Sequence, residues 1–136
     1  MSRMQKFAWF NLAVIALTLL VIVSLLPLLG HKAMGGFGCL GLIGLGPLFF
    51  RKKPGQVIAD ERDYLIQWRA WIFAYALFWV AFVLVASVLS AVVYGEDGMV
   101  PVSIVRISVF WAFLFVYALA SVAILVQYAR GTSDAG

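Results

Sequence analysis

The chain has 136 residues, of which 65% are apolar and only 12% are charged, and its mean hydropathy is +1.04. Soluble domains are about 45–50% apolar and about 25% charged, so these proportions exclude a water-soluble globular domain and a disordered or collagen-like chain. The net charge is +4, and Cys39 is the single cysteine, which excludes an intramolecular disulfide and a multi-cysteine metal or redox motif. The composition therefore predicts an all-α, multi-span membrane protein.

Four apolar segments are long enough to cross a bilayer, whose hydrocarbon core of about 30 Å requires about 17–25 residues of α-helix. The first follows Arg3 and Lys6, but its apolar run exceeds the 7–15 or so residues of a signal-peptide core, so we expect a retained helix. The sequence predicts one domain, residues 1–136, with four transmembrane helices in a bundle. The expected spans are about residues 7–29, 34–50, 71–94 and 102–128, with a loop at 51–70.

Basic residues are distributed unequally between the two sides that these spans define. One side carries Lys32, and its second loop carries Glu96 and Asp97. The other side carries eight basic residues: Arg3, Lys6, Arg51, Lys52, Lys53, Arg62, Arg69 and Arg130. Because Lys and Arg in short loops resist translocation, we expect a multi-pass protein of the cell's inner membrane with both termini cytoplasmic.

Arg106 is the one charged residue inside an expected span, five residues after Pro101. At that depth a long arginine side chain can reach the outer interface, where Glu96 and Asp97 are available as partners. Arg106 is therefore expected to act as an outer-leaflet anchor. The alternative is a binding site for an anionic ligand or lipid headgroup.

The second span contains four glycines at a repeat of three, namely Gly35, Gly38, Gly41 and Gly44. Glycine destabilises a helix by about 1 kcal/mol relative to alanine in water, so their number indicates a need for close backbone approach. The favoured interpretation is helix packing through small residues. The alternative is a re-entrant segment that lines a cavity.

The third and fourth spans carry small and aromatic residues at helical spacing. Ala70, Ala74 and Ala81 form a small-residue stripe that favours a partner helix. Aromatic faces near Trp79 and Trp111 permit a third, weaker hypothesis, that of a carrier for a hydrophobic ligand.

The loop at 51–70 is dense in charge. The triplet Arg51, Lys52 and Lys53 is a stop-transfer signal that can also contact anionic lipid headgroups. Asp60 is a helix N-cap candidate, and acidic residues in the next turn complement the helix dipole, so the third helix is expected to begin near Asp60. Two interpretations of this segment stay open. One is a capped helix start with surface ion pairs, and the other is a docking surface formed by Asp60, Glu61, Arg62 and Arg69.

The segment DERDYLIQWRA, residues 60–70, resembles a DERxxxIxxRA signature in a family of small, uncharacterised multi-span membrane proteins of bacteria and archaea. Members of that family are often encoded beside a helix-turn-helix repressor, so the resemblance implies a sensor or regulatory role and supplies no catalytic residue. The matching positions are Asp60, Glu61, Arg62, Ile66, Arg69 and Ala70.

The functional expectation is a small, non-enzymatic membrane regulator or adaptor that acts through its cytoplasmic loop. The alternative is a small oligomeric transporter, channel or accessory subunit of a membrane complex. No catalytic, cofactor or metal motif is visible in the sequence. Expected partners are the lipid bilayer, anionic headgroups, and a cytoplasmic protein or a second copy of the chain, but not nucleic acid.

Overall fold

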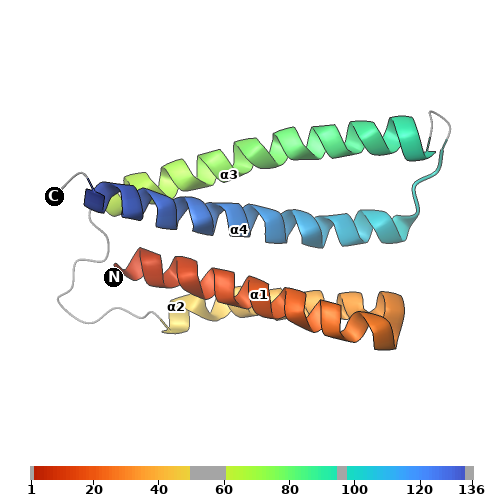
Figure 1. Ribbon diagram of the computed structural model, residues 1–136, viewed down its shortest axis with the longest axis horizontal. Coiled ribbons are helices and arrows are strands. Elements are labelled where there is room, and N and C mark those ends of the chain that lie inside the picture. Colours follow the sequence, from red (N-terminus) through yellow and green to blue (C-terminus); the bar gives the residue numbers. More distant parts are fainter. Residues whose placement is uncertain (1, 50–60, 95–97, 134–136) are drawn as a thin grey trace.

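The computed structural model is all-helical over the residues it describes, which are 2–49, 61–94 and 98–133. Figure 1 shows long helices along a common axis, with α4 between α3 and the pair formed by α1 and the following 3-10 helix, η1. We call the end where α1 begins and α4 ends the terminal end, and the opposite end the turn end. The elements are α1 (Arg3–Leu29), η1 (Gly30–Leu45), α2 (Gly46–Phe49), α3 (Glu61–Val88), the π-helical η2 (Leu89–Tyr94) and α4 (Val102–Ser133).

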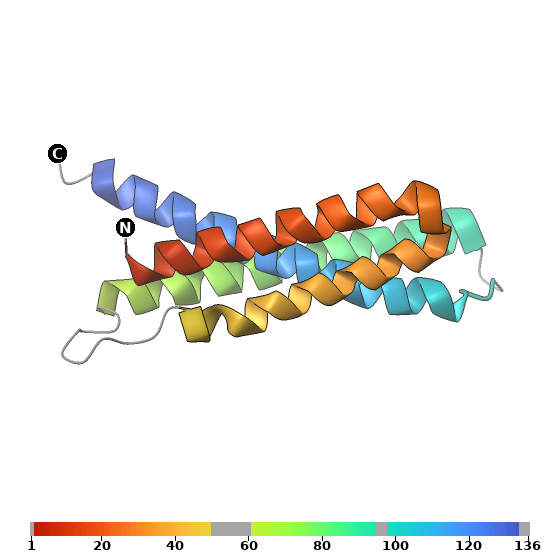
Figure 2. The ribbon, with the colours of Figure 1, turned by 90° about the horizontal axis from the view of Figure 1, so that it is seen from below.

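Both ends of α1 have clear local causes. Ser2 and Gln5 form a capping box, in which the Gln5 backbone N–H donates to Ser2 Oγ at 3.2 Å and the Ser2 N–H donates to Gln5 Oε1 at 2.8 Å. At the other end Gly30 has a φ of 53°, which a residue without a side chain adopts easily. The chain reverses there, and η1 returns along α1 (Figure 2).

The element η1 is a 3-10 helix of 16 residues, far longer than the three or four residues usual for this geometry. Its three-residue turn places every third side chain on the same face. Phe37, Leu40 and Ile43 are buried on one face, while the glycines at 35, 38, 41 and 44 share another face, which is exposed. At about 2.0 Å per residue η1 is about 32 Å long, whereas 16 residues of α-helix extend about 24 Å.

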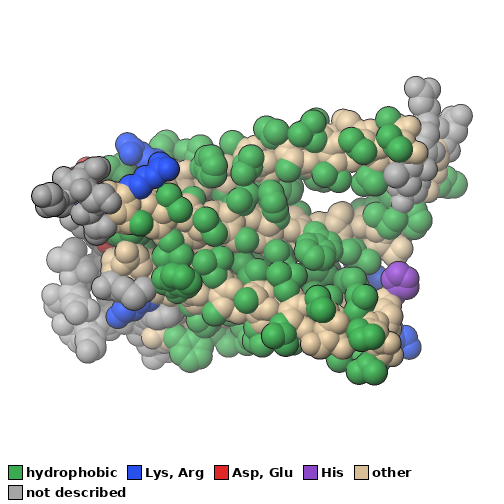
Figure 3. Space-filling model, in the orientation of Figure 1, with side chains coloured by type: hydrophobic (Ala, Val, Ile, Leu, Met, Phe, Trp, Pro, Cys, Tyr) green, Lys and Arg blue, Asp and Glu red, His purple; other side chains and the backbone are tan. Residues whose placement is uncertain are grey.

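Three continuous helical segments among the described residues are long and apolar enough to cross a membrane: Arg3–Leu45, Glu61–Val92 and Val102–Arg130. The prediction of four such helices is therefore not supported. The element η1 follows α1 with no non-helical residue between them, so the two form one segment, Arg3–Leu45, although the chain reverses at Gly30. Apolar side chains cover most of the face seen in Figure 3. These features fit a multi-pass helical membrane protein.

Two apolar clusters hold the helices together. The larger joins α1, η1 and α4 through seven buried residues: Val14, Ile15, Ile22, Phe37, Leu40, Ile43 and Leu114. The smaller lies at the terminal end, where Ala8 of α1, Ile66 and Ala70 of α3 and Ile124 of α4 meet. The buried residues of α3 are Ile66, Ala70 and Ala74, so this helix is anchored at its terminal end and is partly or fully exposed along the rest of its length.

Candidate functional site at the start of helix α3

The first three turns of α3 divide the signature residues into buried and exposed groups. Ile66 and Ala70, four residues apart, lie on one face of the helix and are 8% and 0% exposed. Both pack against Ala8 and Ile124 in the smaller cluster. The described part of α3 begins at Glu61, and Asp60, the expected N-cap, lies outside the described residues. The small-residue stripe is confirmed at Ala70 and Ala74, which are fully buried.

A hydrogen bond between two helices fixes this end of α3 to α4. The Tyr128 hydroxyl donates to Asp63 Oδ1, and both residues are partly buried. Asp63 therefore faces the bundle, on the same side of α3 as Ile66 and Ala70. Sequence reasoning missed this pair, because Tyr128 and Asp63 are 65 residues apart and only the packing of α3 on α4 brings them together.

The remaining side of the first turns of α3 is exposed, and we call it the α3 face. It combines charged side chains with apolar ones, of which Trp68 is 65% exposed. Arg62 and Arg69 are seven residues apart and lie on the same side of the helix. The α3 face consists of Glu61, Arg62, Tyr64, Leu65, Trp68 and Arg69. Aromatic and arginine side chains are enriched both at protein interfaces and at the membrane boundary.

Several predicted site residues fall outside the described residues, so their arrangement at the site stays a prediction. These residues are Arg51, Lys52, Lys53 and Asp60. Within the described ranges, no group of three or more His, Cys, Asp or Glu side chains can hold a metal ion.

The four regularly spaced glycines do not mediate packing within the chain. A Cβ added to Gly35, Gly38, Gly41 or Gly44 would meet no atom within 4 Å. The close approaches to α1 are instead at Gly36, where an added Cβ would lie 2.8 Å from Ile22 Cγ1 and 3.2 Å from Val21 Cγ1, and at Gly46, where it would press against the ring of Phe7. The three-residue repeat matches the turn of a 3-10 helix, which gathers the four glycines on an outward face and turns Gly36 toward α1.

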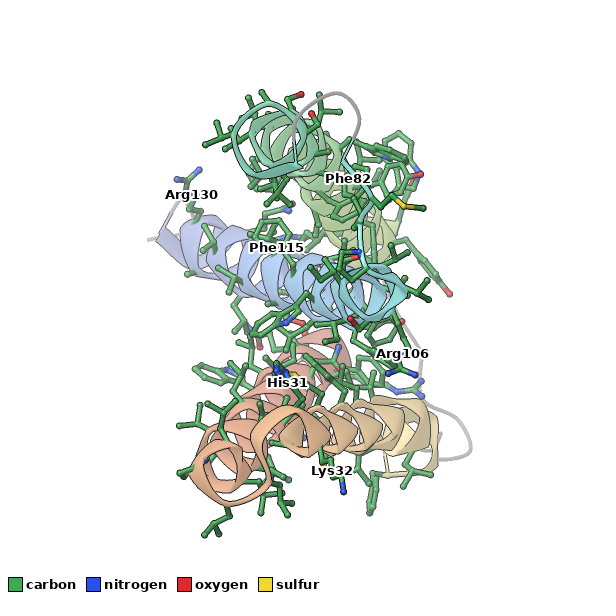
Figure 4. All side chains as sticks on the ribbon, turned by 90° about the vertical axis from the view of Figure 1, so that its right-hand side faces the viewer. His31, Lys32, Phe82, Arg106, Phe115 and Arg130 are labelled. Atoms are coloured by element: carbon green, nitrogen blue, oxygen red, sulfur yellow. The ribbon has the colours of Figure 1, made fainter. Side chains whose placement is uncertain are left out.

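Arg106 lies near the turn end of α4 and is exposed. Figure 4 shows its side chain on the side of α4 that faces η1, with His31 and Lys32 at the nearby reversal of the chain. The described carboxylates, Glu61 and Asp63, lie at the terminal end, and the expected partners at positions 96 and 97 are outside the described ranges. The anchor and ligand interpretations of Arg106 both stay predictions.

Comparison with known proteins identifies the family. The family model described as "Predicted membrane protein (DUF2178)" matches residues 4–130, which is nearly the whole chain. The chain belongs to this family. No curated protein and no solved structure matches the chain.

Membership in DUF2178 agrees with the expectation of an uncharacterised family of membrane proteins. The family match covers α1, η1, α3 and nearly all of α4, so it describes the whole bundle rather than the eleven-residue signature alone. The division of that signature into packing residues and exposed residues comes from the structure, since the sequence string does not distinguish the two groups.

Proposed function

We propose that this DUF2178 protein crosses the membrane four times and is a non-enzymatic regulator or adaptor that acts through the α3 face. In this proposal the terminal end lies in the cytoplasm, and α1 and η1 are two separate crossings. The proposal has two parts, the topology and the binding role, and each has its own support.

The topology is supported by helix length and by charge. A 3-10 helix of 16 residues extends about 32 Å, which matches a hydrocarbon core of about 30 Å. The start of α1, the start of α3 and the end of α4 lie at the terminal end (Figure 1). These regions, with the segment at 51–60, contain eight of the ten basic residues, as the positive-inside rule requires of the cytoplasmic side.

The observation that carries the binding role is the division of the α3 signature. The buried residues of α3 are Ile66, Ala70 and Ala74, whereas Arg62 and Arg69 are exposed and lie outside the apolar clusters. An exposed ion pair contributes only about 0–1 kcal/mol, so stability alone gives little reason for this density of charge. Trp68 supplies apolar area beside the arginines, and such a combination suits contact with a soluble protein.

A photocrosslinking amino acid at position 62 of the full chain, in its native membranes, tests this role. We expect an adduct with a soluble protein, and we expect Arg69→Glu to remove it while Arg69→Lys retains it, because the contact depends on positive charge. A crosslinker at Tyr75, which is exposed in the middle of α3, is the matched control and should capture lipid. Lipid adducts alone at position 62, or a protein adduct insensitive to Arg69→Glu, would contradict the proposal.

A further inference from the structure

A cleft opens between α3 and α4 over the half of the bundle nearest the turn end. Its volume is about 740 Å³, within the range of roughly 300–1,000 Å³ typical of ligand pockets. Phe78 and Phe82 of α3 and Trp111 and Phe115 of α4 line it, and Gly98 lies at its turn-end margin. Figure 4 shows Phe115 on the side of α4 that faces α3.

The cleft follows from the order of side chains along α3. At the terminal end the contact surface of α3 is Ala70 and Ala74, both fully buried, which allows α4 to approach closely. Farther along, the residues facing α4 become large, and the two helices diverge toward the turn end (Figure 1). Ala81 and Ala112 then leave space between the aromatic rings.

The lining of the cleft contains no charged residue within the described ranges. Its two hydroxyl groups are satisfied within their own helices, since Ser90 Oγ donates to Ser87 O at 3.0 Å and Ser108 Oγ donates to Val105 O at 2.7 Å. No hydroxyl proton is therefore left to select a polar ligand. The lining is mostly apolar, so an occupant gains stability here mainly through apolar contact, and the lining residues offer no charged group to pair with an ionic ligand.

We infer that this cleft binds an acyl chain of a membrane lipid from the leaflet at the turn end. The cleft faces the hydrocarbon region along apolar helices, so acyl chains are the molecules that surround its opening. A bound chain would contact the rings of Phe82, Trp111 and Phe115. It would supply the van der Waals contacts that α3 and α4 do not make with each other where they diverge.

The length of the cleft suits an acyl chain. The cleft runs from Phe78 of α3 to Ser90 at the start of η2, which is about 18 Å of helix. This length is close to the depth of one leaflet, about half of a hydrocarbon core of about 30 Å. A helix from a second copy would cover the cleft only in a dimer, and the experiments below distinguish that case.

Tryptophan fluorescence tests the inference. Trp111 lines the cleft and is 43% exposed, whereas Trp79 is 46% exposed and is not among the lining residues. The purified full chain is prepared in two forms that retain only Trp111 or only Trp79, the other tryptophans being replaced by phenylalanine. Phosphatidylcholine with a brominated acyl chain is then titrated into the detergent micelles. We expect saturable quenching of Trp111 at one or two lipids per chain, and quenching of Trp79 that follows the bulk lipid-to-detergent ratio.

Matched variants distinguish the cleft from the general lipid surface. Ala112→Phe fills the cleft and should remove the saturable quenching of Trp111, whereas Val109→Phe places the same aromatic side chain on α4 outside the cleft and should leave the quenching unchanged. Unsaturable quenching of both tryptophans, or equal effects of the two variants, would overturn the inference. A dimer in which Trp111 is shielded from the brominated lipid would also overturn it.

A second measurement uses the unaltered chain and does not depend on the tryptophan replacements. In nanodiscs of phosphatidylcholine with a photoreactive acyl chain, adducts should concentrate on cleft residues of both α3 and α4. Val80 and Val83 are exposed on α3 outside the cleft and serve as the internal reference. Equal labelling of reference and cleft residues would contradict a bound chain.

Discussion

Gly36 and Gly38 lie two residues apart in η1 and have opposite surroundings. A Cβ at Gly36 would press against the buried side chain of Ile22, whereas a Cβ at Gly38 would meet open space. The difference follows from the three-residue turn of the 3-10 helix, which gives the two positions different faces. Of these two positions, only Gly36 therefore requires glycine, even though Gly38 belongs to the more conspicuous sequence repeat.

We predict that Gly36→Ala destabilises the protein by about 1–3 kcal/mol, because Ile22 has to shift within a packed core. Gly38→Ala should instead stabilise it by about 0.4–1 kcal/mol, since alanine lowers the conformational entropy of the unfolded chain without a clash. Reversible unfolding by sodium dodecyl sulfate in mixed micelles measures both free energies. A destabilising effect of Gly38→Ala that grows with protein concentration would indicate that the glycine face contacts another copy.

The four glycines show how far residue-level reasoning from the sequence extends. A repeat of three is the period of a 3-10 helix, so the pattern itself contained the relevant signal. When the repeat is interpreted as part of an α-helix, it predicts close helix packing at the four repeated glycines. The approach at Gly36 depends on which face of η1 turns toward Ile22, and this is decided by the fold-back at Gly30 rather than by the repeat.

At the scale of the helix, α3 has two unlike halves. Its terminal half is bound through Ile66, Ala70 and Ala74, and its other half forms one wall of the cleft. The start of α3 was predictable, because Glu61 and Asp63 favour a helix N-terminus. The divergence of α3 from α4 was not, since it depends on which bulky residues of two distant segments meet face to face.

The hydrogen bond from Tyr128 to Asp63 should make a measurable contribution to this attachment. We predict that Tyr128→Phe destabilises the protein by about 1 kcal/mol, because it removes a donor from a partly buried carboxylate. Tyr64→Phe makes the same chemical change at an exposed position of α3 and is the control, with an expected effect within about 0.5 kcal/mol. The same micelle unfolding assay applies, and equal effects of the two substitutions would show that the hydrogen bond does not stabilise the attachment.

At the scale of the whole molecule, composition was sufficient to predict a helical membrane protein, and the family match agrees. The number of separate crossings depends on how the run from Arg3 to Leu45 is divided. A single crossing by this run would involve 43 residues, about twice the usual number, and would put Lys32 within the segment. A lysine at the centre of a span costs about 2.5–3.5 kcal/mol, which supports the proposal that the reversal at Gly30 divides this run into two crossings.

Cysteine accessibility distinguishes these topologies. In a Cys39→Ser background, we predict that a membrane-impermeant maleimide added to intact cells labels the Lys32→Cys variant and does not label Arg3→Cys or Arg62→Cys. The reason is that α1 and η1 bring the chain back to the terminal end, so positions 3 and 62 lie at the same end of the bundle (Figure 1), which the proposed topology places in the cytoplasm. All three variants should react after the membrane is permeabilised, which is the control for their expression. If Arg3 to Leu45 crosses once, positions 3 and 62 lie on opposite sides, so labelling of one of them in intact cells would contradict four crossings.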